Sequence, residues 1–154
     1  MLTESEPMTI LVVDDDEGHC ELIRRNLRRG GVSNPVVIVH RGDDALDYVY
    51  GRNGLQPAAR PERLLVLLDI NMPGRMNGLD VLREIKSAPA TRKIPVIMLT
   101  TTDDPREISR CYDLGCSVYV TKPIEAQGFI EAIKRLGLFV SIVSLAPHQA
   151  DLAA

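Results

Sequence analysis

The stretch Leu64-Leu65-Val66-Leu67-Leu68-Asp69 decides the fold, because five consecutive apolar residues end at a carboxylate. Such a run, rich in branched aliphatic side chains, is typical of a strand buried on both faces of a parallel sheet. Two other runs have the same character. Residues 10–13 are followed by Asp14-Asp15-Asp16, and residues 94–99 are followed by Thr100. We therefore expect three central strands whose carboxyl ends carry polar residues.

Two shorter apolar runs complete a set of five candidate strands, at residues 36–39 and 118–120. Apolar residues at three- and four-residue spacing predict five intervening helices, over residues 17–29, 43–50, 78–87, 105–114 and 125–136. Asp16 is a candidate N-cap of the first helix, and Gly115 is expected to end the fourth. Strands that alternate with helices predict an α/β fold, a doubly wound five-stranded parallel sheet with five helices.

Composition restricts the kinds of partner and the location. The chain has 154 residues, which suits one domain, and its net charge of −3 comes without a long basic run, so no nucleic-acid surface is expected. Its three cysteines form no C-x-x-C motif, which favours free thiols in a reducing compartment. The N-terminus lacks the apolar segment of a signal peptide, and no apolar stretch is long enough to span a bilayer. We expect a cytoplasmic protein without membrane contact.

The polar residues fall where an open parallel sheet binds ligands, at the carboxyl ends of its strands. Asp14, Asp15 and Asp69 would meet there with Thr100, and Lys122 follows the fifth strand. Carboxylates brought together repel one another unless a cation neutralises them. Mg²⁺ is the natural choice, because it binds through oxygen and uses few protein carboxylates. No His or Cys lies near these strand ends in the sequence, which argues against zinc.

The same residues suit phosphoryl transfer to a protein carboxylate. A carboxylate such as that of Asp69 can attack a phosphoryl group, and the charge that develops on the phosphoryl oxygens needs a metal and fixed donors. Lys122 offers a positive charge and Thr100 a hydroxyl donor. Simpler interpretations remain open at this point. Asp14 and Asp15 could serve only as helix caps, and the other two side chains could be an ordinary strand-end hydroxyl and a surface amine.

Four motifs in order resemble the receiver domain of bacterial two-component response regulators, over roughly residues 8 to 137. They are Val12-Val13-Asp14-Asp15, then Leu67-Leu68-Asp69-Ile70-Asn71-Met72-Pro73 followed by Asn77-Gly78, then Pro95-Val96-Ile97-Met98-Leu99-Thr100, and Tyr119-Val120-Thr121-Lys122-Pro123. The resemblance implies a flavodoxin-like sheet. The chain departs from the family pattern between Asp69 and Gly78, where it has one residue more than usual.

The resemblance also implies a role for each matching residue. Asp69 would be the phosphoacceptor, Asp15 a direct Mg²⁺ ligand, and Asp14 a ligand through water. The expected supporting residues are Asn71, which would offer its backbone carbonyl to the metal, Lys122, which would pair with the phosphoryl oxygens, and Thr100 and Tyr119, the hydroxyl and the aromatic ring of the conformational switch. The chain would be a phosphoacceptor that promotes its own phosphorylation and dephosphorylation, rather than an enzyme.

The expected partners are a sensor histidine kinase and a histidine phosphotransfer protein. The core would be residues 8–137 of a single domain spanning 1–154, with residues 138–154 as a C-terminal extension. Since that extension begins with apolar residues, it is expected either to dock on its own domain or to form a homodimer contact. These features resemble the stand-alone regulators that partner bacterial phytochrome kinases, which signal through altered protein–protein contacts.

Two other classes of function remain as alternatives. A small haloacid-dehalogenase-like phosphatase also uses an Asp nucleophile with Mg²⁺, but its chemistry requires a second acid two residues after the nucleophile, and here that position is Asn71. A binding module with an unused site is the third class. A Mg²⁺ titration would distinguish it, because such a module should show no millimolar affinity for the ion.

Overall fold

The computed structural model describes residues 8–54, 63–101, 104–122 and 126–136. Strands and helices alternate along them. The strands are β1 (Thr9–Val13), β2 (Val36–Val39), β3 (Leu64–Asp69), β4 (Val96–Thr100) and β5 (Val118–Thr121). The helices are α1 (Glu17–Arg29), α2 (Gly42–Tyr50), α3 (Gly78–Ser87), α4 (Pro105–Asp113) and α5 (Ala126–Leu136).

The five strands form one parallel sheet in the order β2-β1-β3-β4-β5. The order reverses between β1 and β3, which is the place where doubly wound sheets bind their ligands. In the register, Val13 is paired with Leu68 and Asp69 with Leu99, so the carboxyl ends of the three central strands lie at one edge. The predicted doubly wound, flavodoxin-like α/β fold is confirmed.

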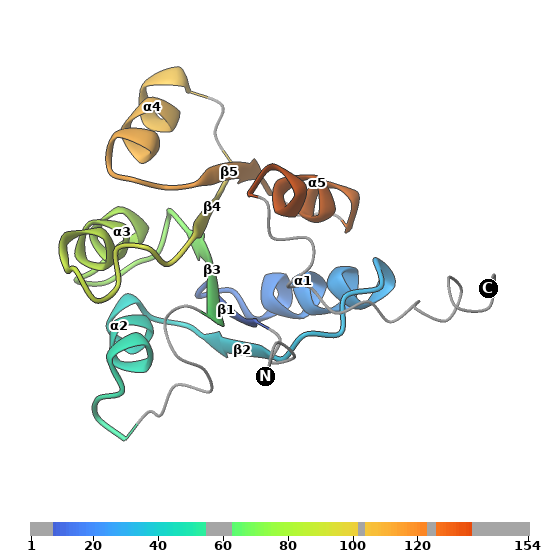
Figure 1. Ribbon diagram of the computed structural model, residues 1–154, viewed down its shortest axis with the longest axis horizontal. Coiled ribbons are helices and arrows are strands. Elements are labelled where there is room, and N and C mark those ends of the chain that lie inside the picture. The colour runs from blue at the N-terminus through green and yellow to red at the C-terminus, as the bar shows by residue number, and fades with distance from the viewer. Residues whose placement is uncertain (1–7, 55–62, 102–103, 123–125, 137–154) are drawn as a thin grey trace, which may run out of the picture.

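The helices cover both faces of the sheet, as Figure 1 shows. Helices α1 and α5 lie on one side, and α2, α3 and α4 on the other. Alternate residues of each central strand therefore enter different cores. Leu65 and Leu67 pack with α1 and α5, whereas Val66 and Leu68 pack on the side of the other three helices. Every residue of β1, β3 and β4 is buried, as their uninterrupted apolar sequences predicted.

The boundaries differ slightly from those expected. β4 begins at Val96 rather than at residue 94, and Pro95, which has no N–H to donate, contributes only its carbonyl, which accepts from the Val66 N–H at 3.1 Å. α4 ends at Asp113, and Gly115 follows with a φ of 104°, in the left-handed region that glycine favours. The prediction that Gly115 marks the end of this helix holds to within two residues.

The remaining expectations concern the cysteines, membrane-spanning helices and the C-terminal extension. The three cysteines are free and buried. Among the helices in the described ranges, none combines the length and the apolar character needed to cross a membrane. Residues 55–62, between α2 and β3, and the C-terminal extension, residues 138–154, lie outside the described residues.

Candidate functional site

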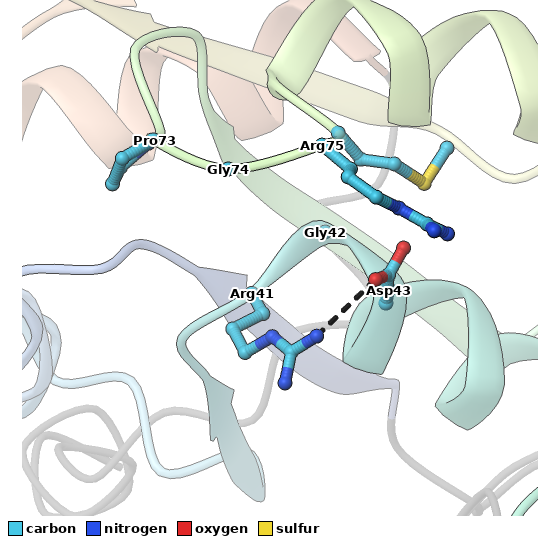
Figure 2. Close-up of a pocket in the computed structure, with 7 residues that line it drawn as sticks. Arg41, Gly42, Asp43, Pro73, Gly74 and Arg75 are labelled. Atoms are coloured by element: carbon cyan, nitrogen blue, oxygen red, sulfur yellow. Dashed lines mark hydrogen bonds and ion pairs between the residues drawn. The ribbon is translucent and has the colours of Figure 1, made fainter.

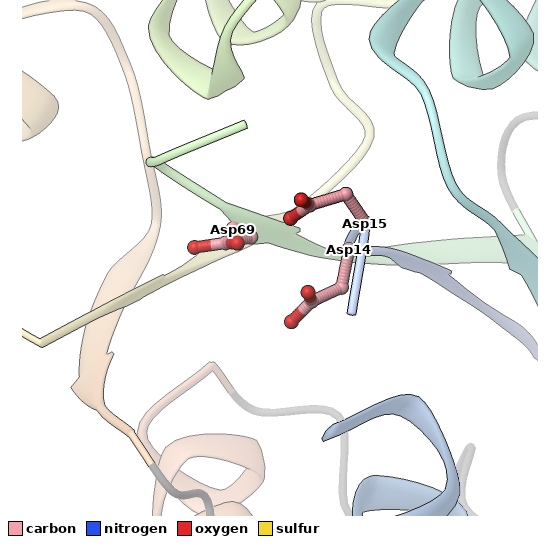
Figure 3. A group of neighbouring side chains, drawn as sticks. All are labelled: Asp14, Asp15 and Asp69. Atoms are coloured by element: carbon pink, nitrogen blue, oxygen red, sulfur yellow. The ribbon is translucent and has the colours of Figure 1, made fainter. Parts of the chain in front are cut away.

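Three carboxylates meet at the carboxyl edge of the sheet. Asp14 and Asp15 directly follow β1, and Asp69 ends β3 beside them (Figure 3). One carboxylate oxygen from each lies within 4.8 Å of the others. Lys122 completes the group from the end of β5, with its Nζ 3.1 Å from Asp69 Oδ2 and 3.4 Å from Asp14 Oδ2. The expected convergence of Asp14, Asp15, Asp69 and Lys122 is present.

The backbone around Asp69 is fixed by the turn that follows it. The Asn71 N–H donates to Asp69 Oδ1 at 3.2 Å, and the Gly78 N–H donates to the carbonyl of Ile70 at 3.0 Å. A Cβ atom on Gly78 would lie 2.1 Å from the carbonyl oxygen of Asp69, a distance that no side chain can occupy. The start of α3 therefore approaches the end of β3 closely only because residue 78 is glycine.

Asp14 is fully buried and receives more hydrogen bonds than its sequence position suggested. Its Oδ1 accepts from the Asp16 N–H at 3.0 Å, and its Oδ2 contacts His19 Nδ1 as well as Lys122. Its main-chain carbonyl accepts from His40 Nδ1 at 3.0 Å. The expectation that no His or Cys lies near the strand ends is therefore wrong, because Cys20 Sγ also donates to the Asp14 carbonyl, at 3.4 Å. His19 comes from the first turn of α1 and His40 directly follows β2.

Burial and neighbouring charges shift the pKa values of Asp69 and Lys122. Burial, followed by the charge of Asp14, raises the pKa of the Asp69 carboxyl, and the nearby Lys122 ammonium only partly offsets this. Burial lowers the pKa of Lys122, but the two carboxylates outweigh it, so the net shift is upward and the amine stays charged. A single ammonium thus faces a cluster of acids, which leaves the site favourable for a further cation.

The donor set fits the divalent metal expected from the sequence. Hard cations such as Mg²⁺ bind carboxylate oxygens, and the cluster of Asp14, Asp15 and Asp69 contains no sulfur or nitrogen donor. Asp15 is exposed and so can present its carboxylate to an ion that keeps several waters. Within the described residues, this is the only acidic group of three or more that could hold a metal ion.

Two other expected site residues lie next to the carboxylates, Thr100 at the end of β4 and Asn71 in the turn after β3. Thr100 is 1% exposed at the end of β4, and its carbonyl accepts from the Lys122 N–H at 2.8 Å, which ties the lysine to this strand. Asn71 is exposed in the turn after Asp69. Thr100 is thus connected to the site through its carbonyl, which binds Lys122, and Asn71 through its N–H, which binds Asp69.

Tyr119 lies on β5, partly buried against the core beneath α4. Its ring meets Tyr112 of α4 edge-on, with 6.1 Å between centroids and an interplanar angle of 86°. Tyr112 is 42% exposed, the one large apolar side chain so exposed among the described residues. The aromatic pair thus connects β5 to the surface of α4.

A hollow of about 270 Å³ lies beside the site, between the start of α2 and the loop joining β3 to α3 (Figure 2). Arg41 and Asp43 form an ion pair of 3.2 Å on one wall. Gly42, which lies between these two residues in the chain, approaches the loop so closely that a Cβ atom would lie 2.9 Å from the Cβ and carbonyl oxygen of Met76. The segment with the extra residue is therefore held against α2 at Met76, while Gly74 and Arg75 are exposed.

Comparison with known proteins identifies the family. A family model described as the response regulator receiver domain matches residues 10–134. The chain belongs to the response regulator receiver domain family. In this family an aspartate accepts a phosphoryl group, and the partners are histidine kinases. Receiver domains are signalling phosphoacceptors and are generally not classed as enzymes.

Three of the similar proteins are response regulators, and two of these, RtBRR and RcpA, are phytochrome response regulators by name. Response regulator Rcp1 from Synechocystis is 28% identical over 133 residues, covering 86% of this chain and 88% of Rcp1. The bacteriophytochrome response regulator RtBRR has a TM-score of 0.77 and 36% identity, covering 87% of this chain and 80% of its own. The phosphorylated cyanobacterial phytochrome response regulator RcpA has a TM-score of 0.72 and 33% identity, covering 88% and 96%. None of these comparisons supports the phosphatase alternative.

Sequence reasoning did not find His19 and His40 as neighbours of Asp14. His40 had a usable signal, since it follows the second predicted strand directly and so belongs to the same sheet edge. His19 had none, because its position depends on how Asp14-Asp15-Asp16 turns the chain into α1. Asp16 caps that helix, as expected, by accepting from the His19 N–H at 3.1 Å.

Proposed function

We propose that this receiver domain accepts a phosphoryl group on Asp69 from the phosphohistidine of a sensor histidine kinase. The observation that carries the proposal is the position of the Asp69 carboxylate, 3.1 Å from the Lys122 ammonium and within a cluster that also includes Asp14 and Asp15. An oxygen of Asp69 forms the new bond to phosphorus. The P–N bond of the phosphohistidine breaks, and the imidazole leaves with the electron pair of that bond.

The surrounding residues have separate tasks in this proposal. Asp15, Asp69 and the backbone carbonyl of Asn71 would hold Mg²⁺ directly, and Asp14 would hold it through water. When bound, the ion supplies positive charge against the phosphoryl oxygens. A Mn²⁺-bound structure exists for Rcp1, the relative described above, which supports a divalent metal in this cluster. Lys122 pairs with the phosphoryl oxygens from the opposite side and keeps a fixed charge there.

Switching involves Thr100 and Tyr119. The phosphoryl group adds about two negative charges at the end of β3, and the Thr100 hydroxyl donates to it. Tyr119 then turns inward and separates from Tyr112, so that the surface of α4 and β5 changes for a partner protein. The buried position of Thr100 and the edge-on packing of the two rings support this role.

The proposed kinase is a bacteriophytochrome, and a histidine phosphotransfer protein is a second possible phosphoryl partner in the same cytoplasmic pathway. The names of RtBRR and RcpA support the first assignment. We also propose that the chain forms a homodimer in which residues 138–154 take part. On the described part of the chain, β5 lies at the end of the sheet with one neighbouring strand, and exposed Tyr112 lies beside it.

Phosphate incorporation tests the central proposal. The wild-type protein, incubated with Mg²⁺ and labelled acetyl phosphate or a phosphorylated histidine kinase, should acquire an alkali-labile phosphoryl group. Asp69→Asn should abolish the labelling, because the nucleophile is removed without loss of volume. Asp113→Asn, which changes an exposed carboxylate on α4, is the matched control and should be labelled like the wild type. Undiminished labelling of the Asp69 variant would refute the assignment.

A further inference from the structure

The His19 side chain contacts the Asp14 carboxylate, and the proposed chemistry does not use it. It lies in the first turn of α1, and its side chain is 10% exposed. Its Nδ1 contacts Asp14 Oδ2, and its other ring nitrogen, Nε2, is buried without a hydrogen-bond partner among the described residues. A ring that is so enclosed, with one nitrogen directed at a buried carboxylate, has a fixed orientation.

The pattern of contacts determines which nitrogen carries the hydrogen. A carboxylate oxygen accepts, so the hydrogen between His19 and Asp14 belongs to Nδ1. Nδ1 is therefore the ring atom that donates to Asp14, in the way that outer partners commonly hydrogen-bond the carboxylates of metal sites.

We infer that His19 is a positioning residue that orients the Asp14 carboxylate for metal binding. Two of the three donors to that carboxylate are local to the turn after β1, the Asp16 N–H on Oδ1 and His19 on Oδ2. The third, Lys122, is shared with Asp69 and comes from the far end of the sheet. His19 is thus the side-chain donor that Asp14 does not share with the phosphoacceptor.

Because Asp69 shares Lys122 but not His19, phosphorylation should affect the two contacts of Asp14 differently. The inference therefore rests on the proposed function. A phosphoryl group on Asp69 would compete for Lys122, and the lysine contact with Asp14, already 3.4 Å long, would weaken. His19 and the Asp16 N–H would then keep the carboxylate in place in both states. Without His19, Asp14 could rotate toward Lys122 or away from the metal, so that part of the oriented donor set would be lost.

Mg²⁺ affinity of the unphosphorylated protein tests the role directly. The chain has no Trp, so the titration is best followed by amide chemical shifts of ¹⁵N-labelled protein around Asp69 and Asn71. His19→Leu, which removes the donor but keeps an apolar side chain of similar size, should weaken Mg²⁺ binding by about 10-fold, at the lower end of the effect of outer-sphere partners. His19→Asn places an amide donor near the position of Nδ1 and should restore most of the affinity.

Two further variants separate this inference from the proposed function. Asp15→Asn should lose Mg²⁺ binding whatever His19 does, because Asp15 is a proposed direct ligand. His19→Phe removes the donor with a ring in place and serves if the leucine variant does not fold, as checked by circular dichroism. If the wild-type protein does not bind Mg²⁺, the proposed metal site fails and the inference with it.

If the wild type binds and Asp15→Asn does not, only the role of His19 is in question. Unchanged or tighter Mg²⁺ binding in the donor-free variants would then overturn it. A loss in His19→Asn as large as in His19→Leu would also overturn it, because the ring would then contribute through packing alone.

Discussion

Asp69 is buried beside a second carboxylate, so its charge is unfavourable in the metal-free protein. Since its pKa is raised in the folded state, Asp69 contributes stability that is fully present below the unfolded pKa, near 3.8, and is lost as the pH rises through the raised value. The Asn side chain resembles protonated Asp but does not ionise, so the Asn variant does not lose this stability as the pH rises. With EDTA present, Asp69→Asn should be more stable than the wild type at pH 7, and the gap should narrow toward pH 4.

Urea unfolding of both proteins across this pH range measures the effect. The acids that lie away from the site are common to the two proteins, so their contribution cancels in the difference. A gap that stays constant with pH, or a wild type that is the more stable protein at pH 7, would contradict the electrostatic description of the site. Saturating Mg²⁺ should reduce the advantage of the Asn variant, because the ion binds the wild-type cluster.

At the level of single residues, the sequence predicted the site because its members follow strands directly. Asp15, Asp69 and Lys122 needed only the rule that parallel strands end at one edge. The contact of His19 with Asp14 could not be predicted in that way, since no repeating pattern relates a helix residue to a strand end across a turn. The choice of Nδ1 as the donor, equally, depends on a contact that only the packed structure defines.

At the level of elements, the connection from β3 to α3 depends on Gly78. A Cβ atom there would lie 2.1 Å from the Asp69 carbonyl oxygen and 2.7 Å from the Cα of Ile70, so Gly78→Ala must displace the helix or the strand end. We expect a loss of about 3 kcal/mol of unfolding free energy, as for severe overpacking. Because the displacement reaches Asp69, phosphate incorporation should also fall.

Gly128 provides the matched control. It lies within α5, where an added Cβ atom meets nothing within 4 Å. Gly128→Ala should therefore stabilise the protein by up to about 1 kcal/mol, the difference in helix propensity. Denaturant unfolding of the two variants measures both changes. If the two Gly→Ala variants changed the free energy of unfolding equally, the close approach of residue 78 to Asp69 would not be the reason for a glycine at residue 78.

The burial of the strands could be predicted from the sequence for some strands but not for all. β1, β3 and β4 have uninterrupted apolar sequences and are buried throughout. β2, with the sequence Val-Val-Ile-Val, is as apolar as they are, yet all four of its residues are only partly buried because it lies at the edge of the sheet. Position in the sheet is a property of the assembled fold, and the apolar pattern of one strand does not encode it.

At the level of the whole molecule, the proposed homodimer can be tested by mass. Sedimentation of the full chain should give twice the monomer mass of 17.0 kDa, whereas a chain ending at residue 137 should sediment as a monomer if the extension carries the contact. Tyr112→Glu, which places a charge beside β5, should weaken the dimer of the full chain. A monomeric full chain, with or without phosphorylation, would contradict the proposal.

The loop between β3 and α3 is closed by Gly78, which packs against Asp69 at its start, and it is held against α2 where Met76 meets Gly42. Between Asp69 and Met76, the tip formed by Pro73, Gly74 and Arg75 is exposed, and Gly74 adopts a φ of 102°. An insertion or deletion at that exposed tip would thus leave the phosphoacceptor where it is. Relatives could therefore diverge in the length of this segment, and in what it recognises, while keeping the same phosphorylation chemistry.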